Sequence, residues 1–419
     1  MIRRQVLHNG LTLLTEEMPN IRSVCMGVWL KQGSRHETED ENGISHFIEH
    51  LLFKGTERRT AQEIAKTIDK IGGQCDAFTS KEYTCFYARV LDEHLPVAFD
   101  LLADIVLRPK FDPDLIEKER NVIFEEIKMV EDSPDELVFD LFTETIWRDH
   151  PLGRPIQGTA ESVAALDTGR LTRFFRTSYH PRNVAISVAG NLDHDRVATM
   201  AMEAFGRLGD EHPDRSVSVP RPRAEVVVRE KKELEQLHLC VGVPAFEQAH
   251  PGRYCGYVLN TVLGGTMSSR LFQNIREDRG LAYTVFSSIN SFADTGYLAV
   301  YAATRPEGAS EVASLICEEF ARMKETPVDE TELKDAKDHL KGNLMLSLES
   351  SSARMSNLAR QEIYFDKQFS LDEILAGIDA VASDQVQAMA RRVLDGRYCT
   401  AAILGRLDGL KFDRSTFAF

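Results

Sequence analysis

The chain lacks any arrangement of cysteines that would form a disulfide framework or bind a metal ion. It has seven cysteines in 419 residues, an odd number, and no two of them stand in a Cys-x-x-Cys pair. A thiolate zinc site of the usual spacing is therefore excluded, and scattered, unpaired cysteines favour a reducing compartment.

Long apolar runs are absent as well. No stretch of about 18 apolar residues occurs, so no membrane-spanning helix is expected. The chain begins with basic residues, but the polar segment from His8 to Gly10 interrupts the apolar stretch that a signal peptide requires. We therefore expect a cytoplasmic protein, or a protein of the mitochondrial matrix in a eukaryotic cell.

Basic residues are fewer than acidic residues in this chain. Lys and Arg number 50 against 65 Asp and Glu, which gives a formal net charge of −15. Such a surface repels phosphate backbones, so nucleic acid is not expected as a partner. At 419 residues the chain is long for one hydrophobic core, and two domains are the expectation.

The most informative motif is a pentapeptide in which His46, Glu49 and His50 occupy positions i, i+3 and i+4. On a helix these positions share one face, so both imidazoles can reach one metal ion with a carboxylate beside them. The order is the inverted H-x-x-E-H signature of zinc hydrolases. The neighbouring residues are apolar, and polar groups on such a helix need partners, which a bound metal provides. We therefore predict one Zn²⁺ per chain.

A catalytic zinc site needs a third protein ligand. The segment from Asp114 to Glu131 has apolar residues at helical spacing, and its Glu119 and Glu126 are seven residues apart, on nearly the same face. Glu125 projects about 100° away from Glu126 and is expected in solvent. Either Glu119 or Glu126 could bind the metal while the other orients a histidine; spacing does not choose between them. A charged surface helix is the simpler alternative for such a segment.

The sequence divides near its middle. Charge, Pro and Gly cluster over residues 209–224 without hydrophobic periodicity, which is typical of a linker. We predict a zinc-binding domain over 1–208 and a second domain over 225–419.

The two halves resemble each other, which indicates a duplication of one α+β unit. Both have two early strands, an apolar helix ending at Gly-Thr, further strands and a closing strand. The corresponding segments are Leu11–Glu17 with Val226–Arg229, Val24–Leu30 with Leu237–Val243, Phe47–Thr56 with Tyr257–Thr266, Cys75–Val90 with Thr284–Ala303, and Asn183–Gly190 with Cys399–Gly405. Aligned on the Gly-Thr steps, Gly256, Leu259 and Asn260 replace the residues of the zinc motif. The second half therefore lacks the ligands.

Several motifs together identify a family. They are Gly43–Thr56 around the pentapeptide, the Glu119–Glu126 helix, Gly264–Phe272, Arg276, and Gly280–Tyr283. Over essentially its whole length, the chain resembles the pitrilysin/insulinase family of zinc peptidases, most closely the short class of mitochondrial processing peptidase subunits and bacterial relatives. The resemblance implies two similar α+β domains, each an antiparallel sheet backed by helices.

The resemblance also assigns residues. It implies that Glu126 is the third metal ligand and that Glu119 is a supporting carboxylate. It implies that Arg276 and Tyr283 reach the substrate near the scissile bond. It places an extended substrate along an edge strand that contains Asp76, Ala77, Phe78 and Thr79. Many relatives have Asn in place of Asp76, and the change adds a negative charge that could favour basic peptides or could be neutral.

The function that follows is a zinc endopeptidase acting on unfolded or short peptides in a chamber between paired domains. Glu49 would take a proton from the attacking water and pass it to the leaving amine, Tyr283 would stabilise the oxyanion, and Arg276 would position the peptide. Long relatives have four such domains in one chain, so a homodimer is expected here. The alternatives are a non-catalytic core subunit of the same fold, or a catalytic subunit that requires a different, metal-less partner chain.

Overall fold

The computed structural model describes all residues except 207 and 209–216. The chain forms two compact units, one of Met1–Lys128, Arg154–Val217 and Leu346–Gln368, the other of Met129–Gly153, Ser218–Met345 and Phe369–Phe419. The predicted linker spans 209–224. Its residues 209–216 lie outside the described part of the chain, and 217–224 contain neither helix nor strand.

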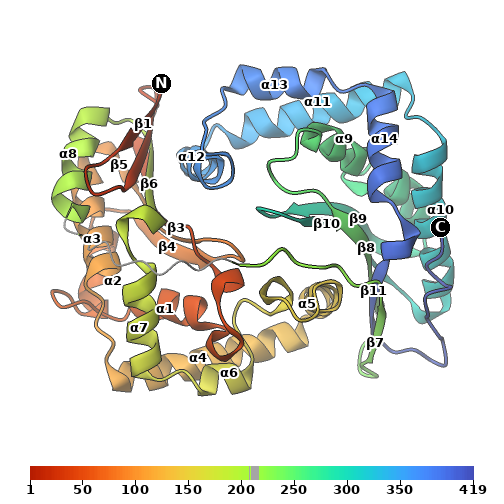
Figure 1. Ribbon diagram of the computed structural model, residues 1–419, viewed down its shortest axis with the longest axis horizontal. Helices are drawn as coiled ribbons and strands as arrows, with labels where there is room; N and C mark the ends of the chain where they lie inside the picture. Colours follow the sequence, from red (N-terminus) through yellow and green to blue (C-terminus); the bar gives the residue numbers. More distant parts are fainter. Residues whose placement is uncertain (207, 209–216) are drawn as a thin grey trace. The chain divides into compact units, whose positions relative to one another are not determined.

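The first unit is built on a six-stranded sheet with the order β1-β2-β6-β3-β5-β4 (Figure 1). All neighbouring strands are antiparallel except β2 and β6, which run parallel. Its strands are β1 Ile2–Val6, β2 Thr12–Glu17, β3 Ser23–Leu30, β4 Gln74–Thr79, β5 Thr84–Leu91 and β6 Val184–Gly190.

Helices cover both faces of this sheet. The core lies between one face and α1, α3 and α8, while α12 packs on the opposite face against β2, β3 and β6. The helices of this unit are α1 Ile44–Leu52, α2 Ala61–Lys70, α3 Leu95–Leu107, α6 Ala160–Ala164, α7 Thr168–Ser178, α8 His194–Phe205 and α12 Ser351–Phe365, together with most of α4 Pro113–Asp132. Central strand β3 is accordingly a continuous apolar run, as expected of a strand buried on both faces.

The second unit repeats the plan with five strands in the order β7-β11-β8-β10-β9, where β7 and β11 are the parallel pair. Helices α9, α10 and α14 cover one face and α5 covers the other. The strands are β7 Val226–Glu230, β8 Leu237–Ala245, β9 Ala282–Ser291, β10 Gly296–Thr304 and β11 Thr400–Gly405. The helices are α5 Pro134–Ile146, α9 Arg253–Gly264, α10 Ala309–Glu325, α11 Glu330–Ser347, α13 Leu371–Asp379 and α14 Ser383–Val393.

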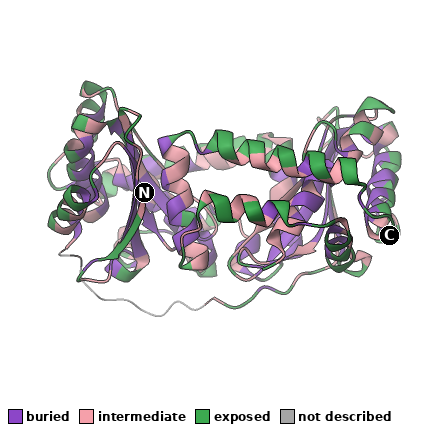
Figure 2. Ribbon diagram, turned by 90° about the horizontal axis from the view of Figure 1, so that it is seen from above, coloured by how far each residue is buried: buried purple, intermediate pink, exposed green. Residues whose placement is uncertain are grey.

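The units therefore differ from the predicted domains at two segments, because each sheet takes one covering helix from the other half of the sequence. Helix α5 packs on the second sheet and α12 on the first. A glycine in each central strand lets that helix approach closely. A Cβ on Gly27 would lie 2.5 Å from Met355 Sδ, and one on Gly242 would lie 2.7 Å from Phe142 Cζ. Buried residues, purple in Figure 2, follow the strands and the helix faces against them.

The predicted fold class, two duplicated sheet-plus-helix halves, is confirmed. The prediction that each sheet is antiparallel was wrong in one detail, because each sheet includes one parallel pair of strands. The seven cysteines are all free thiols. No helix among the described residues has the length and apolar character needed to cross a membrane.

Candidate metal centre

Helix α1 is held at its N-terminus by a glycine and a buried carboxylate. Gly43 has φ = +92°, and a Cβ there would lie 2.6 Å from the carbonyl oxygen of Gln157, so only glycine fits. The carboxylate of Glu37, 2% exposed, accepts hydrogen bonds from the backbone N–H groups of Gly43 at 2.8 Å and Ser45 at 2.9 Å. Burial raises the pKa of Glu37 to about 7.

The other side of the centre is α4. Its Glu119 is buried, whereas the side chain of Glu126, two turns further on, is 37% exposed and faces the histidines of α1. Glu125 lies in solvent and pairs with Lys128, as its predicted direction requires. The two helices therefore bring carboxylates and imidazoles together from segments about 70 residues apart in sequence.

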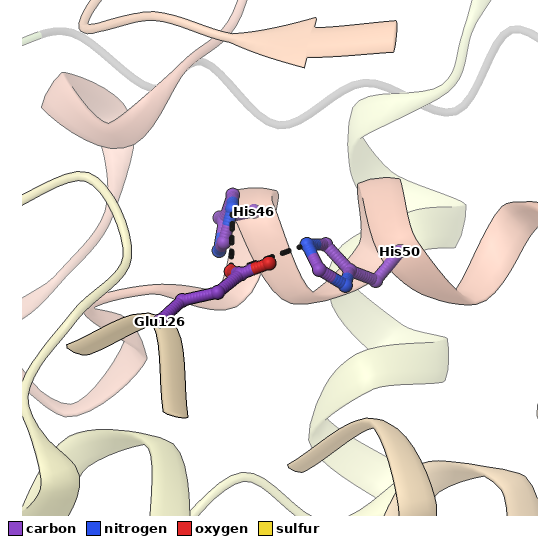
Figure 3. Close-up of side chains that lie close together, drawn as sticks. All are labelled: His46, His50 and Glu126. Carbon is purple, nitrogen blue, oxygen red and sulfur yellow. Dashed lines mark ion pairs between the residues drawn. The ribbon is translucent and has the colours of Figure 1, made fainter. Parts of the chain in front are cut away.

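His46, His50 and Glu126 converge on one point (Figure 3). Glu126 Oε2 lies 3.6 Å from His46 Nε2 and 3.5 Å from His50 Nε2. A tetrahedral zinc ion with bonds of about 2.0–2.1 Å separates two ligand atoms by about 3.3 Å. The observed spacing is long for hydrogen bonds and close to the spacing of metal ligands. Two imidazoles and one carboxylate are also a donor set of catalytic zinc sites, so these residues fit the ion.

Electrostatics support the same use. Burial, together with the neighbouring charge of His50, lowers the pKa of His46 to about 4. His46 is therefore neutral near pH 7, which is the form that binds a metal.

Glu119 supports the centre without joining it. Its Oε2 lies 3.4 Å from His50 Nδ1 and its Oε1 lies 2.9 Å from Lys54 Nζ. A carboxylate on Nδ1 leaves Nε2 free to bind the metal and fixes the ring orientation. His46 has no equivalent support, since its buried Nδ1 has no hydrogen-bond partner among the described residues. The geometry thus supports Glu126 as ligand and Glu119 as the orienting group.

Glu49 stands beside the three converging residues. It accepts a hydrogen bond of 2.5 Å from the hydroxyl of Thr79, the last residue of β4. Burial raises the pKa of Glu49, an effect that this hydrogen bond opposes. A carboxylate with a raised pKa that remains partly accessible is suited to accept a proton from water near neutral pH.

The predicted substrate strand is β4, and it is an edge of its sheet. Asp76 and Phe78 project to one face, while Ala77 and Thr79 project to the face that α1 covers. An exposed edge presents backbone groups with which a peptide can pair.

The other two predicted residues lie together in the second unit. Arg276 is on a short π-helix, Phe272–Glu277, a geometry found frequently at functional sites. Its guanidinium lies 4.7 Å from the ring centre of Phe272 and 4.9 Å from that of Tyr283. Tyr283 is 77% exposed, and both Arg276 and Tyr283 line a cavity of about 770 Å³.

Sequence reasoning missed two contributors, Glu37 and Lys54. Glu37 stands seven residues before α1, outside the usual N-cap spacing, and Lys54 was read only as part of a family motif. Their roles follow from tertiary contacts alone: Glu37 binds backbone N–H groups at the start of α1, and Lys54 pairs with Glu119.

Comparison with known proteins places the chain in a family. The model of the insulinase family, peptidase family M16, matches residues 12–160, and that of the peptidase M16 inactive domain matches 165–340. The chain is 44% identical over 403 residues to the uncharacterized zinc protease YmxG of Bacillus subtilis, with 96% of this chain and 98% of that protein covered. It is 41% identical over 416 residues to an uncharacterized zinc protease of Streptomyces coelicolor, with 97% and 90% covered. The chain belongs to peptidase family M16.

Solved structures agree on the fold. A protease from Helicobacter pylori superposes with a TM-score of 0.89 at 21% identity, over 97% of this chain and 99% of that one. A chain of complex III from Candida albicans superposes with a TM-score of 0.87 at 21% identity, over the whole of both chains.

Proposed function

We propose that this chain is a zinc-dependent endopeptidase that hydrolyses unfolded or short peptides. The observation that carries the proposal is the convergence of His46, His50 and Glu126, with Glu49 beside them. The zinc proteases among its relatives support the same class of activity.

The chemistry divides between the ion and the side chains. A bound zinc ion would supply Lewis-acid activation of water and of the scissile carbonyl. Glu49 accepts the proton of the attacking water and delivers it to the leaving amine. Thr79, by donating to one oxygen of Glu49, fixes the carboxylate so that the other oxygen can take the proton. Glu119 and Lys54 hold His50 in one orientation.

The substrate would pair with edge strand β4 as an additional strand. Main-chain hydrogen bonds of this kind depend little on side-chain identity, which suits a peptidase of broad specificity. Arg276 and Tyr283 would then act on the bound peptide, Arg276 by positioning it and Tyr283 by stabilising the oxyanion. Their stacking in the second unit supports a shared task.

A direct test is peptide hydrolysis by the purified, zinc-loaded chain. Chelation should abolish activity and stoichiometric zinc should restore it. Glu49→Gln should retain about one zinc per chain and lose roughly 10²–10⁴-fold in kcat, because an amide cannot accept the proton. Exposed Glu57→Gln is the matched control and should behave as wild type. Retained activity in zinc-loaded Glu49→Gln would disprove the mechanism.

Assembly is a second part of the proposal. Since long relatives contain four such domains and this chain has two units, a homodimer would restore four, with Arg276 and Tyr283 acting on the partner's zinc site. Subunits of Glu49→Gln should therefore complement subunits of Arg276→Ala/Tyr283→Phe. Random exchange makes half of the dimers mixed, and about a quarter of wild-type activity should return. No recovery, with mixed dimers verified by mass spectrometry, would exclude action in trans.

The alternatives give different results in gel filtration with a peptidase assay on each peak. A non-catalytic core subunit would be inactive in every peak even when loaded with zinc. A subunit that requires a different partner would be inactive alone and active once that partner is added. A closed chamber additionally predicts that flexible peptides are cleaved whereas a stably folded protein is not.

A further inference from the structure

The open edge of β4 has a defined hydrogen-bonding pattern. The turn into β5 is closed by a hydrogen bond of 2.8 Å from Ser80 N–H to the Tyr83 carbonyl. In an antiparallel pair, bonded and non-bonded residue pairs alternate. Ser80 and Tyr83 form a hydrogen-bonded pair, so two residues back along the register Phe78 and Cys85 form the next one. Ala77 and Phe86 lie one residue further along and form a non-hydrogen-bonded pair. The N–H and C=O of Ala77 therefore point away from β5, towards the open edge.

That outward N–H is already occupied. The carboxylate of Asp76 accepts it at 2.8 Å. Asp76 is exposed, and nothing else in the described part of the chain hydrogen-bonds its side chain. A carboxylate on an edge N–H competes with another strand for that donor, and charged side chains are a known protection of sheet edges.

The same face of the strand carries an apolar surface. Phe78, two residues beyond Asp76, projects to the same face and is 37% exposed. Its ring packs edge-on against Trp29 and near Tyr87, so it is fixed in place. A lysine or arginine side chain of a bound peptide could contact both groups. Its aliphatic stem would pack on the ring of Phe78, and its charged end would pair with the carboxylate of Asp76.

We propose that Asp76 is a specificity-determining residue that couples strand pairing at β4 to recognition of a lysine or arginine in the peptide. The inference rests on the proposed peptidase function. When a peptide pairs with β4, its backbone carbonyl needs the Ala77 N–H, and the Asp76 carboxylate must give it up. A neutral peptide leaves that carboxylate without a partner, whereas a basic side chain beside Asp76 replaces the lost hydrogen bond.

The test uses two peptides that differ by Lys or Gln at one position flanking the cleaved bond, with the position chosen by scanning. Wild type, Asp76→Ala, Asp76→Asn and exposed Asp69→Ala are compared. Asp69→Ala removes the same charge away from the strand and should match wild type. Zinc content and circular dichroism check that each variant is intact. Dissociation constants are measured on the Glu49→Gln background.

Asp76→Ala should bind the Gln peptide about 3- to 10-fold more tightly, the equivalent of an exposed hydrogen bond of about 0.7–1.4 kcal/mol. Asp76→Asn keeps an acceptor oxygen for Ala77 but loses the charge, so it should weaken only the Lys peptide. In both variants the preference for Lys over Gln should fall. An unchanged preference in both, with peptides still cleaved by wild type, would overturn the role of Asp76 and leave the peptidase function standing. Binding without any hydrolysis by zinc-loaded wild type would instead overturn the peptidase function.

Discussion

Helix α1 of the first unit and helix α9 of the second are equivalent elements of two similar folds. Each packs beside the edge strand of its sheet, α1 against β4 and α9 against β9. Yet α1 presents His46, Glu49 and His50, whereas α9 has Gly256, Leu259 and Asn260 at the aligned positions. In the second copy the space of the first histidine is filled, since a Cβ on Gly256 would lie 2.1 Å from the ring of Phe246.

Helix α9 shows that the fold does not require the histidines and the glutamate that α1 carries. Leu259 is fully buried in its core, and Asn260 accepts a hydrogen bond of 2.9 Å from Ser287, so both side chains of α9 have partners within the protein. No group of potential metal ligands occurs among the described residues of the second unit. The same fold thus accommodates a cluster of potential metal ligands in one copy and ordinary packing in the other.

The largest effect that would test this contrast is expected at the third ligand. Glu126→Gln should lose most bound zinc and with it nearly all activity, because two imidazoles alone do not make a catalytic site. Glu125→Gln, one residue earlier and in solvent, should retain both. Metal content by mass spectrometry and hydrolysis rates measure the pair. Full zinc occupancy in Glu126→Gln would place the third ligand elsewhere.

The next effect concerns what the second unit contributes in place of a metal. Tyr283→Phe removes one hydroxyl and should reduce kcat about 10²–10³-fold, the usual loss for one oxyanion donor. Zinc content should not change. Tyr398→Phe, another exposed tyrosine of the second unit, is the control. If kcat stays at the wild-type value, the second unit supplies no oxyanion donor through this residue.

A smaller effect is expected from Glu119. Glu119→Gln should weaken zinc affinity or activity by roughly 10–100-fold, as second-shell changes do, because His50 loses its charged partner. Zinc dissociation constants measured by chelator competition distinguish it from Glu126→Gln. An empty site in Glu119→Gln beside a full one in Glu126→Gln would reverse the two roles.

The last effect is on stability rather than on activity and concerns the start of each helix, because α1 has the buried Glu37 whereas α9 begins after Gly252 without a side-chain cap. The folded-state pKa of Glu37 is about 7 against an ordinary 4.5. A raised pKa means that the folded state holds the proton more tightly. The stability due to this group is therefore complete below pH 4.5 and is lost as the pH rises to about 7.

Between these limits the free energy of unfolding of wild type should fall by up to about 3 kcal/mol relative to that of Glu37→Gln, which has no such titration. Denaturant titrations of the metal-free proteins from pH 4.5 to 8 measure the difference, with exposed Glu39→Gln as control. Parallel pH curves for wild type and Glu37→Gln would show that Glu37 does not titrate in this range.

The sequence alone was sufficient for the local features of this protein. The zinc motif, the helix bearing Glu119 and Glu126, and the early and closing strands of both halves depend on periodicity and spacing within short segments, which local physics determines. The direction of Glu125 into solvent follows from helical geometry in the same way.

Only the tertiary structure decided the rest, because it depends on contacts between segments that are distant in sequence. The exchange of α5 and α12 between the sheets and the parallel pairs β2–β6 and β7–β11 are both choices of partner. The same holds for Glu37 beneath α1 and for Asp76 on the outward N–H of Ala77. Contacts between residues distant in sequence do not produce a periodic pattern in either segment, so they cannot be predicted from local patterns.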